Sequence, residues 1–153
     1  RLRGTISVSG DHQLTSSFDV AMEEDVNGIP TPAPSGASCS SYAQGFGSGR
    51  FAGPEVQTSG QRQLYFAVDV TGGYHGPGAY TTAALIRGTA SFSIPTSVGN
   101  AYQLYRSSNH GSTTVRVAAD GSGSVTFVEW GAVEHRAQYT AGFLSGSVSW
   151  RCG

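Results

Sequence analysis

The last segment of the chain, Leu144 to Cys152, has the pattern that most limits what this protein can fold into. Apolar or small residues occupy one parity of the segment, and serines with one arginine occupy the other. A two-residue period of this length is typical of a β-strand with one buried face, because successive side chains of a strand point to opposite sides. Trp150 falls on the apolar parity, so we expect it in the core.

Alternation of this kind recurs along most of the chain, and no window shows the 3.6-residue period of an amphipathic helix. The pattern predicts an all-β chain of about nine strands, an antiparallel β-sandwich of two sheets that is immunoglobulin-like or jelly-roll-like. Its 22 glycines and 12% of charged residues suit short strands joined by tight turns. The alternating segments are 2–8, 14–22, 63–70, 80–86, 90–94, 102–106, 113–117, 125–130, 133–139 and 143–152.

A chain of 153 residues is expected to form a single domain, here residues 1–153. One long stretch, residues 26–62, lacks alternation and is rich in proline, glycine and serine. We expect it to be an irregular loop, although loops of this length in compact domains also conceal elements that pattern alone misses.

The two cysteines, Cys39 and Cys152, lie far apart and form no C-x-x-C motif, which argues against a zinc ribbon or a thioredoxin-like site. The favoured interpretation is a structural disulfide formed in an oxidising compartment, and the alternative is two buried free thiols. A bridge would tie the last strand to the first third of the chain.

Charge and hydrophobicity argue against nucleic-acid binding and against a membrane span. Nine arginines, no lysine and ten acidic residues leave no basic stripe, so nucleic-acid binding has no electrostatic support. No apolar run reaches the length of a membrane span. Because Arg1 begins directly in strand-like sequence, we expect a mature or trimmed chain.

Histidines and nucleophile motifs give no support for catalysis or metal binding. His12, His75 and His110 lie in turn-like sequence and His135 on the apolar parity of a strand, with no chelating pair among them. We therefore expect three surface histidines, one partly buried histidine, no metal and no other cofactor. No G-x-S-x-G motif is present either, so the chain is expected not to be an enzyme.

The weaker alternative is an enzyme that hydrolyses glycosides with a pair of carboxylates. Glu129 stands out because a carboxylate among aromatic residues can have a raised pKa, although an outward-facing side chain is the simpler interpretation. The run Glu23–Asp25 is interpreted as a solvated strand end, with a cation-binding carboxylate cluster as the alternative. The carboxylates available for pairing are Glu23, Glu24, Asp69, Glu129 and Glu134.

Aromatic side chains near the glycine-rich loop Gly73–Tyr80 are candidates for a ligand surface. Sugar-binding sandwiches stack rings on such side chains, although most aromatic residues of a β-protein are core or cross-strand partners. Tyr102 and Tyr105 are further candidates for the ligand surface, on the condition that their side chains are exposed. The residues we predict to bind a ligand are Tyr74, His75, Tyr80 and Trp130.

Two motifs resemble those of exported β-domains of actinobacteria, many of them lipoproteins without an assigned activity. Tyr74-His-Gly-Pro-Gly-Ala-Tyr80 is similar to their Y-x-G-P-G-x-Y loop. The segment from Val115 through Asp120-Gly-Ser-Gly to Trp150-Arg-Cys152 is similar to their D-G-S-G hairpin and G-x-W-x-C ending. The resemblance spans about residues 64–153 and implies an exported domain whose last cysteine pairs with an early one. It implies no catalytic residues.

These observations together predict an extracellular or cell-envelope domain that is not an enzyme and has a binding or structural role. Its ligand is unknown, a glycan or an envelope protein being the candidates. The alternatives are a carbohydrate-binding sandwich module and a self-assembling surface or filament subunit, since low charge and many strand edges favour homo-oligomers.

Overall fold

The computed structural model describes residues 1–97, 99–133 and 142–153. These residues form an antiparallel β-structure, as predicted, with thirteen strands instead of about nine. None of the described helices is long and apolar enough to cross a membrane. The strands are β1 (Leu2–Gly10), β2 (Leu14–Val20), β3 (Glu23–Val26), β4 (Ile29–Pro32), β5 (Phe51–Ala52), β6 (Val56–Gln57), β7 (Gln63–Val70), β8 (Gly78–Tyr80), β9 (Ile86–Thr96), β10 (Gly99–Arg106), β11 (Ser112–Val117), β12 (Gly123–Val133) and β13 (Phe143–Cys152).

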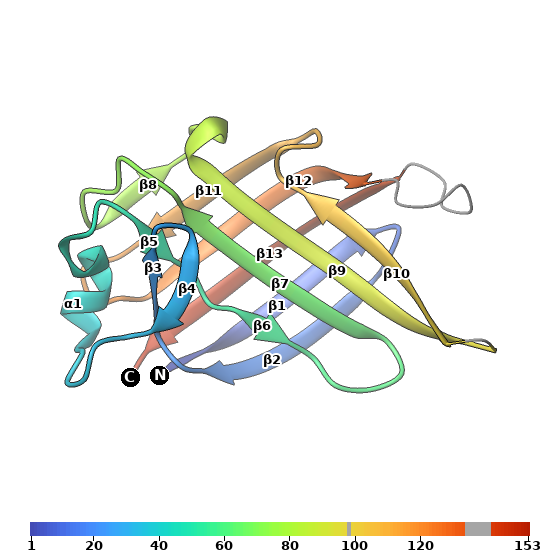
Figure 1. The fold of residues 1–153 in the computed structure, drawn as a ribbon, viewed down its shortest axis with the longest axis horizontal. Coiled ribbons are helices and arrows are strands. Elements are labelled where there is room, and N and C mark those ends of the chain that lie inside the picture. The colour runs from blue at the N-terminus through green and yellow to red at the C-terminus, as the bar shows by residue number, and fades with distance from the viewer. Residues whose placement is uncertain (98, 134–141) are drawn as a thin grey trace.

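Eleven strands form one curled sheet, in which the order β2-β1-β13-β12-β10-β9-β7-β5 runs along the main path and β6, β8 and β11 pair at its sides. Strands β7 and β9 cross in front of β13 and β12, so the curled sheet has two facing layers (Figure 1). The predicted sandwich is therefore confirmed, but its layers belong to one continuous sheet instead of two separate ones. This continuity follows from β12, which pairs into both layers.

A β-bulge in β12 makes the corner between the layers. The strand pairs with β11 as far as Val128 and with β10 from Gly131 onward, and it pairs with β13 up to Phe127 and again from Trp130. Between them Glu129 has a φ of 53°, and its N–H donates to Ser145 Oγ at 2.8 Å. The extra residue shifts by one position the set of side chains that point inward. Phe127 before the bulge and Trp130 after it therefore both lie in the core.

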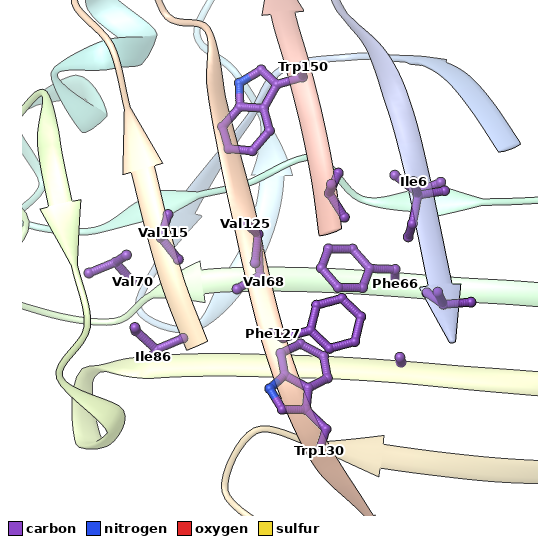
Figure 2. Close-up of a cluster of buried hydrophobic side chains, with 14 of the residues drawn as sticks. Ile6, Phe66, Val68, Val70, Ile86, Val115, Val125, Phe127, Trp130 and Trp150 are labelled. Carbon is purple, nitrogen blue, oxygen red and sulfur yellow. The ribbon is translucent and has the colours of Figure 1, made fainter. Parts of the chain in front are cut away.

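The core lies between the two layers, and Figure 2 shows part of it, with Phe66 and Phe127 between Trp130 and Trp150. The ring of Phe66, from β7, lies 5.6 Å from Phe127 and 5.8 Å from Trp130, both on β12. Trp150 is 3% exposed and its Nε1 donates to the carbonyl of Gly121 at 2.9 Å. The predicted core position of Trp150 is confirmed.

The predicted irregular loop at 26–62 is wrong in part, because short elements fill it. Strands β3 and β4 form a hairpin whose turn residues, Asn27 and Gly28, have φ of 54° and 87°, as a type I′ turn requires. Helix α1 (Cys39–Ala43) starts because the Ser38 side chain accepts the N–H of Ser41. Short segments of this kind have too few residues to show a period.

The disulfide prediction is confirmed. Cys39, the first residue of α1, is bonded to Cys152 at the end of β13, across a sequence separation of 113 residues. The two chain ends lie side by side there, since Leu2 of β1 pairs with Cys152.

The predicted strand Tyr80–Ile86 is also wrong. Strand β8 ends at Tyr80, a 3₁₀ turn η2 covers Ala83–Leu85, and β9 begins at Ile86. Because β8 pairs with β11 and β9 pairs with β7, the chain must leave one part of the sheet before it joins the other. A similar short 3₁₀ turn, η1 (Gly45–Gly47), follows α1. The predicted strand 133–139 lies almost wholly outside the described residues.

Candidate functional site

The chain between β7 and β9 encloses a pocket of about 230 Å³, which we name the tyrosine-loop pocket. Its base is formed by Val70 and Ile86, which pair across the two strands and are 1% and 6% exposed. The described residues lining it include no Asp, Glu, Lys or Arg. They are Val70, Gly72, Gly73, His75, Ala79, Tyr80, Thr81, Thr82, Leu85 and Ile86.

Tyr74 supports this pocket from behind and is not part of its wall. It is 5% exposed, and its hydroxyl donates to the carbonyl of Ala43 in α1 at 2.6 Å. Its ring stacks on Phe51 at 4.9 Å and on Tyr80 at 4.8 Å. Burial raises the pKa of the Tyr74 hydroxyl well above its ordinary value. The predicted ligand-binding side chain is therefore a buried anchor of the loop.

Tyr80 closes the loop on itself and contributes its half-buried ring to the pocket. Its hydroxyl donates to the carbonyl of Gly76 and accepts the backbone N–H of His75 at 3.1 Å. The exposed His75 ring lies 5.3 Å from the Tyr80 ring. The structure thus brings three of the four predicted residues together, with His75 and Tyr80 lining the pocket and Tyr74 holding it.

Trp130, the fourth predicted residue, is 0% exposed. Its Nε1 donates to Thr113 Oγ1 at 2.8 Å, and its ring stacks on Phe127 at 4.3 Å. The expectation that Trp130 is exposed is wrong, because the β12 bulge turns it inward. Tyr105 is likewise buried, whereas Tyr102 is 60% exposed.

A second cavity, also of about 230 Å³, lies on the outer face of β7 and β9 under the β3–β4 hairpin, which lies in front of the sheet in Figure 1. We name it the acidic cavity, because three carboxylates and one guanidinium are among its described lining residues. Those residues are Glu23, Gly28, Pro30, Gly53, Glu55, Tyr65, Ala67, Asp69, Arg87 and Thr89.

An ion-pair network fastens the hairpin over this cavity. Arg87 Nη2 lies 2.5 Å from Asp69 Oδ2 and 3.8 Å from Asp25 Oδ2, and Arg50 Nη1 lies 3.6 Å from Asp25 Oδ1. The Asp25 side chain is 0% exposed and also accepts the N–H of Gly28. The prediction that Glu23–Asp25 is a solvated strand end is therefore wrong for Asp25, which has two arginines to offset its burial.

The raised pKa values of two carboxyl groups, those of Glu23 and Asp69, indicate that negative charge is disfavoured in the acidic cavity. Burial, followed by the nearby carboxylates of Glu55 and Asp69, raises the pKa of Glu23. Burial also raises the pKa of Asp69, although its bond to Arg87 acts in the opposite direction. Like charges in a partly buried space disfavour ionisation of one another.

The remaining predicted side chains form no further site. Glu129 faces outward and lies 3.5 Å from His110, which agrees with the simpler interpretation of an exposed carboxylate. The prediction of His12 at the surface is wrong, because it is 6% exposed, stacks on Phe92 at 4.1 Å and meets Gln103 Oε1 at 2.7 Å. Glu134 and His135 lie outside the described residues. Within the described part of the chain, no group of three or more His, Cys, Asp or Glu could hold a metal ion.

Sequence reasoning missed Thr81, Thr82 and Leu85, because the segment that carries them was interpreted as a strand. It also missed Arg87. The register of β7 and β9 pairs Arg87 with Asp69, directly beside the pair formed by Val70 and Ile86. Antiparallel alignment of residues 63–70 with 86–93 is the signal that pairs these two charges.

No protein-family model matches the chain, and neither a curated protein nor a solved structure shows significant similarity to it.

Proposed function

We propose that this protein is an exported binding domain of the cell envelope without enzymatic activity, and that the tyrosine-loop pocket is its ligand site. The Cys39–Cys152 bond supports export, because structural disulfides persist in oxidising compartments. The likeness of the Tyr74–Tyr80 loop to exported actinobacterial domains supports the same compartment.

The observation that carries the proposal is a pocket whose loop is fixed by hydrogen bonds and ring stacking but whose lining keeps polar side chains without a hydrogen bond to a described residue. Tyr74 and Tyr80 fix the loop through their hydroxyls and stacked rings. The side chains of His75, Thr81 and Thr82, by contrast, make no hydrogen bond to any described residue. A preformed site of this kind binds with a smaller entropic cost than a site that must be ordered by its ligand.

The lining also indicates what the ligand is not. A charged ligand would lose part of its hydration in the pocket and gain no ion pair from the described lining residues. The pocket therefore suits a small uncharged ligand with hydrogen-bonding groups.

A ligand-observed NMR screen of uncharged fragments tests the proposal. Thr82→Phe blocks the pocket at an exposed position that makes no side-chain hydrogen bond to a described residue, and Thr126→Phe, exposed on β12, is the matched control. We expect fragments that bind the wild type to be lost with Thr82→Phe and retained with Thr126→Phe. Fragments that bind Thr82→Phe as well as they bind the wild type, or a screen without binders, would contradict the proposal.

A further inference from the structure

We infer that the ligand of the tyrosine-loop pocket is the terminal ring of a neutral sugar chain, an inference that rests on the proposed function of that pocket. Three properties of the pocket lead to it: its size and closed base, the mixture of apolar and polar groups on its walls, and the lack of charge among its described lining residues.

The size and base of the pocket select one ring at the end of a chain. Its volume of about 230 Å³ lies below the roughly 300–1,000 Å³ of pockets for drug-sized ligands. Val70 and Ile86 close it on the core side, where both side chains are packed in the hydrophobic cluster. A ring with chain continuing on both sides has no exit through this base, whereas a terminal ring needs only the open mouth.

The walls combine an apolar part with unpaired hydrogen-bonding groups. Leu85 is 39% exposed beside the half-buried Tyr80 ring, which gives an apolar surface for the C–H face of a sugar. The adjacent hydroxyls of Thr81 and Thr82 each offer one donor and two acceptor positions, and the His75 imidazole offers a donor and an acceptor. A sugar ring carries hydroxyls at its edge that are matched to such groups.

Other small ligands fit this set of groups less well. A purely apolar ligand would cover the Thr81 and Thr82 hydroxyls without replacing their hydrogen bonds to water, which opposes binding. An anionic or cationic ligand belongs to a charged site, and the two charged residues next to the base on β7 and β9, Asp69 and Arg87, lie on the opposite face of these strands. A neutral polyhydroxyl ring satisfies both conditions.

Binding of the labelled protein to an array of neutral glycans tests the inference. Thr81→Val/Thr82→Val removes both hydroxyls with little change of shape, and Thr126→Val is the control outside the pocket. We expect the wild type to bind glycans that share one terminal sugar, with affinity for them lowered roughly tenfold or more in the double variant and unchanged in the control. The methyl glycoside of that sugar should compete with the glycans.

Equal binding by the double variant and the wild type would overturn the inference, and so would binding that follows an internal repeat regardless of the terminal sugar. If uncharged fragments bind the wild-type pocket but no neutral glycan does, the sugar inference fails while the proposed function remains. If neither binds, both fail. Melting temperatures of all variants, with Leu85→Ala as a second pocket variant, establish that any loss of binding does not arise from unfolding.

Discussion

Two tyrosines of the same loop have different roles because their burial differs. Tyr74 is 5% exposed and satisfies its hydroxyl on the carbonyl of Ala43 in a helix that is remote in sequence. Tyr80 is half-buried, so one part of its ring packs on Tyr74 and another part lines the pocket. The same residue type can therefore either anchor the loop or line the pocket. The exposed fraction of the side chain decides which of the two it does.

The role of Tyr74 as an anchor predicts a stability change. Tyr74→Phe keeps the ring stacks but leaves the carbonyl of Ala43 without this donor, so we expect the free energy of unfolding to fall by about 1–2 kcal/mol. Tyr102→Phe, at a 60% exposed position, should leave it unchanged. Urea unfolding of both variants measures the difference, and equal stabilities would show that the hydroxyl of Tyr74 does not anchor the loop.

Glu23 predicts a pH dependence. Its pKa is raised in the folded state, so the native protein binds this proton more tightly than the unfolded chain does. The contribution of Glu23 to stability is then fully present below its ordinary pKa of 4.5 and is lost as pH rises through the folded pKa. Glu23→Gln removes this loss, and we expect its advantage over the wild type to grow from pH 4 to pH 7, to at most about 1 kcal/mol because the group is partly exposed.

Chemical unfolding across that pH range measures the effect of Glu23→Gln. Glu23→Asp keeps a carboxyl near Glu55 and Asp69 and serves as the control, with a pH profile that follows the wild type. An advantage of Glu23→Gln that shrinks as pH rises would show that Glu23 is stabilised as an anion, against the structure.

At the scale of elements, the bulge in β12 decides which aromatic residues form the core. The backbone of Glu129 adopts a left-handed conformation, which a residue with a Cβ adopts at a cost. The bulge places one extra residue between Phe127 and Trp130, which keeps both rings inside and lets the strand pass from β11 to β10 as partner. The corner of the curled sheet thus depends on a single backbone position.

Glycine substitutions at this position and at its neighbour test the bulge. Glu129→Gly gains conformational freedom where φ is positive, which offsets the usual entropic cost of glycine, so we expect stability to change by less than about 0.5 kcal/mol. Val128→Gly, at the neighbouring exposed residue, should lower it by about 1 kcal/mol. Thermal unfolding of both variants decides, and a larger loss for Glu129→Gly would contradict the bulge.

How much the sequence predicts differs from element to element, for physical reasons. Long strands such as β13 and the β1–β2 hairpin show enough alternation to be predicted with their buried faces. The change of parity between Phe127 and Trp130 is visible in the sequence, but alternation alone does not say that a bulge causes it. Strands β3 and β4 have four residues each and helix α1 has five, too few for a period.

The candidate site was predicted in part for the same reason. Its glycine-rich loop can be predicted from residue types alone, because Gly76 and its neighbours favour turns. The burial of Tyr74 is not, since it depends on Ala43 and Phe51, which are distant in sequence and meet the loop only after the layers fold together. The opposition of Asp69 and Arg87 requires the register of β7 and β9.

At the scale of the whole molecule, the disulfide joins the start of α1 to the last strand. This bond closes a loop of 113 residues in sequence and secures the short elements of the least regular segment to the sheet. In the chain-entropy account, cross-links of this span stabilise by about 4–5 kcal/mol, and measured values are often lower. The bond therefore contributes a large fraction of the stability typical of a domain.

Removal of the bond predicts a marked loss. Cys39→Ser/Cys152→Ser should lower the free energy of unfolding by a few kcal/mol, about 2–4. A reductant should likewise lower the melting temperature of the wild type and leave that of the double variant unchanged. A wild-type melting temperature that is insensitive to reductant would contradict this account of the bond.

The central claim, that the uncharged tyrosine-loop pocket binds the terminal ring of a neutral sugar chain, is tested most directly by an amide-resolved NMR titration of the wild-type protein. The titrants are the methyl glycosides of glucose, galactose, mannose and N-acetylglucosamine. We expect saturable shifts with at least one of them, largest for the amides between Gly72 and Ile86. Shifts centred instead on the acidic cavity near Glu55, or no saturable shift with any of the four, would contradict the claim.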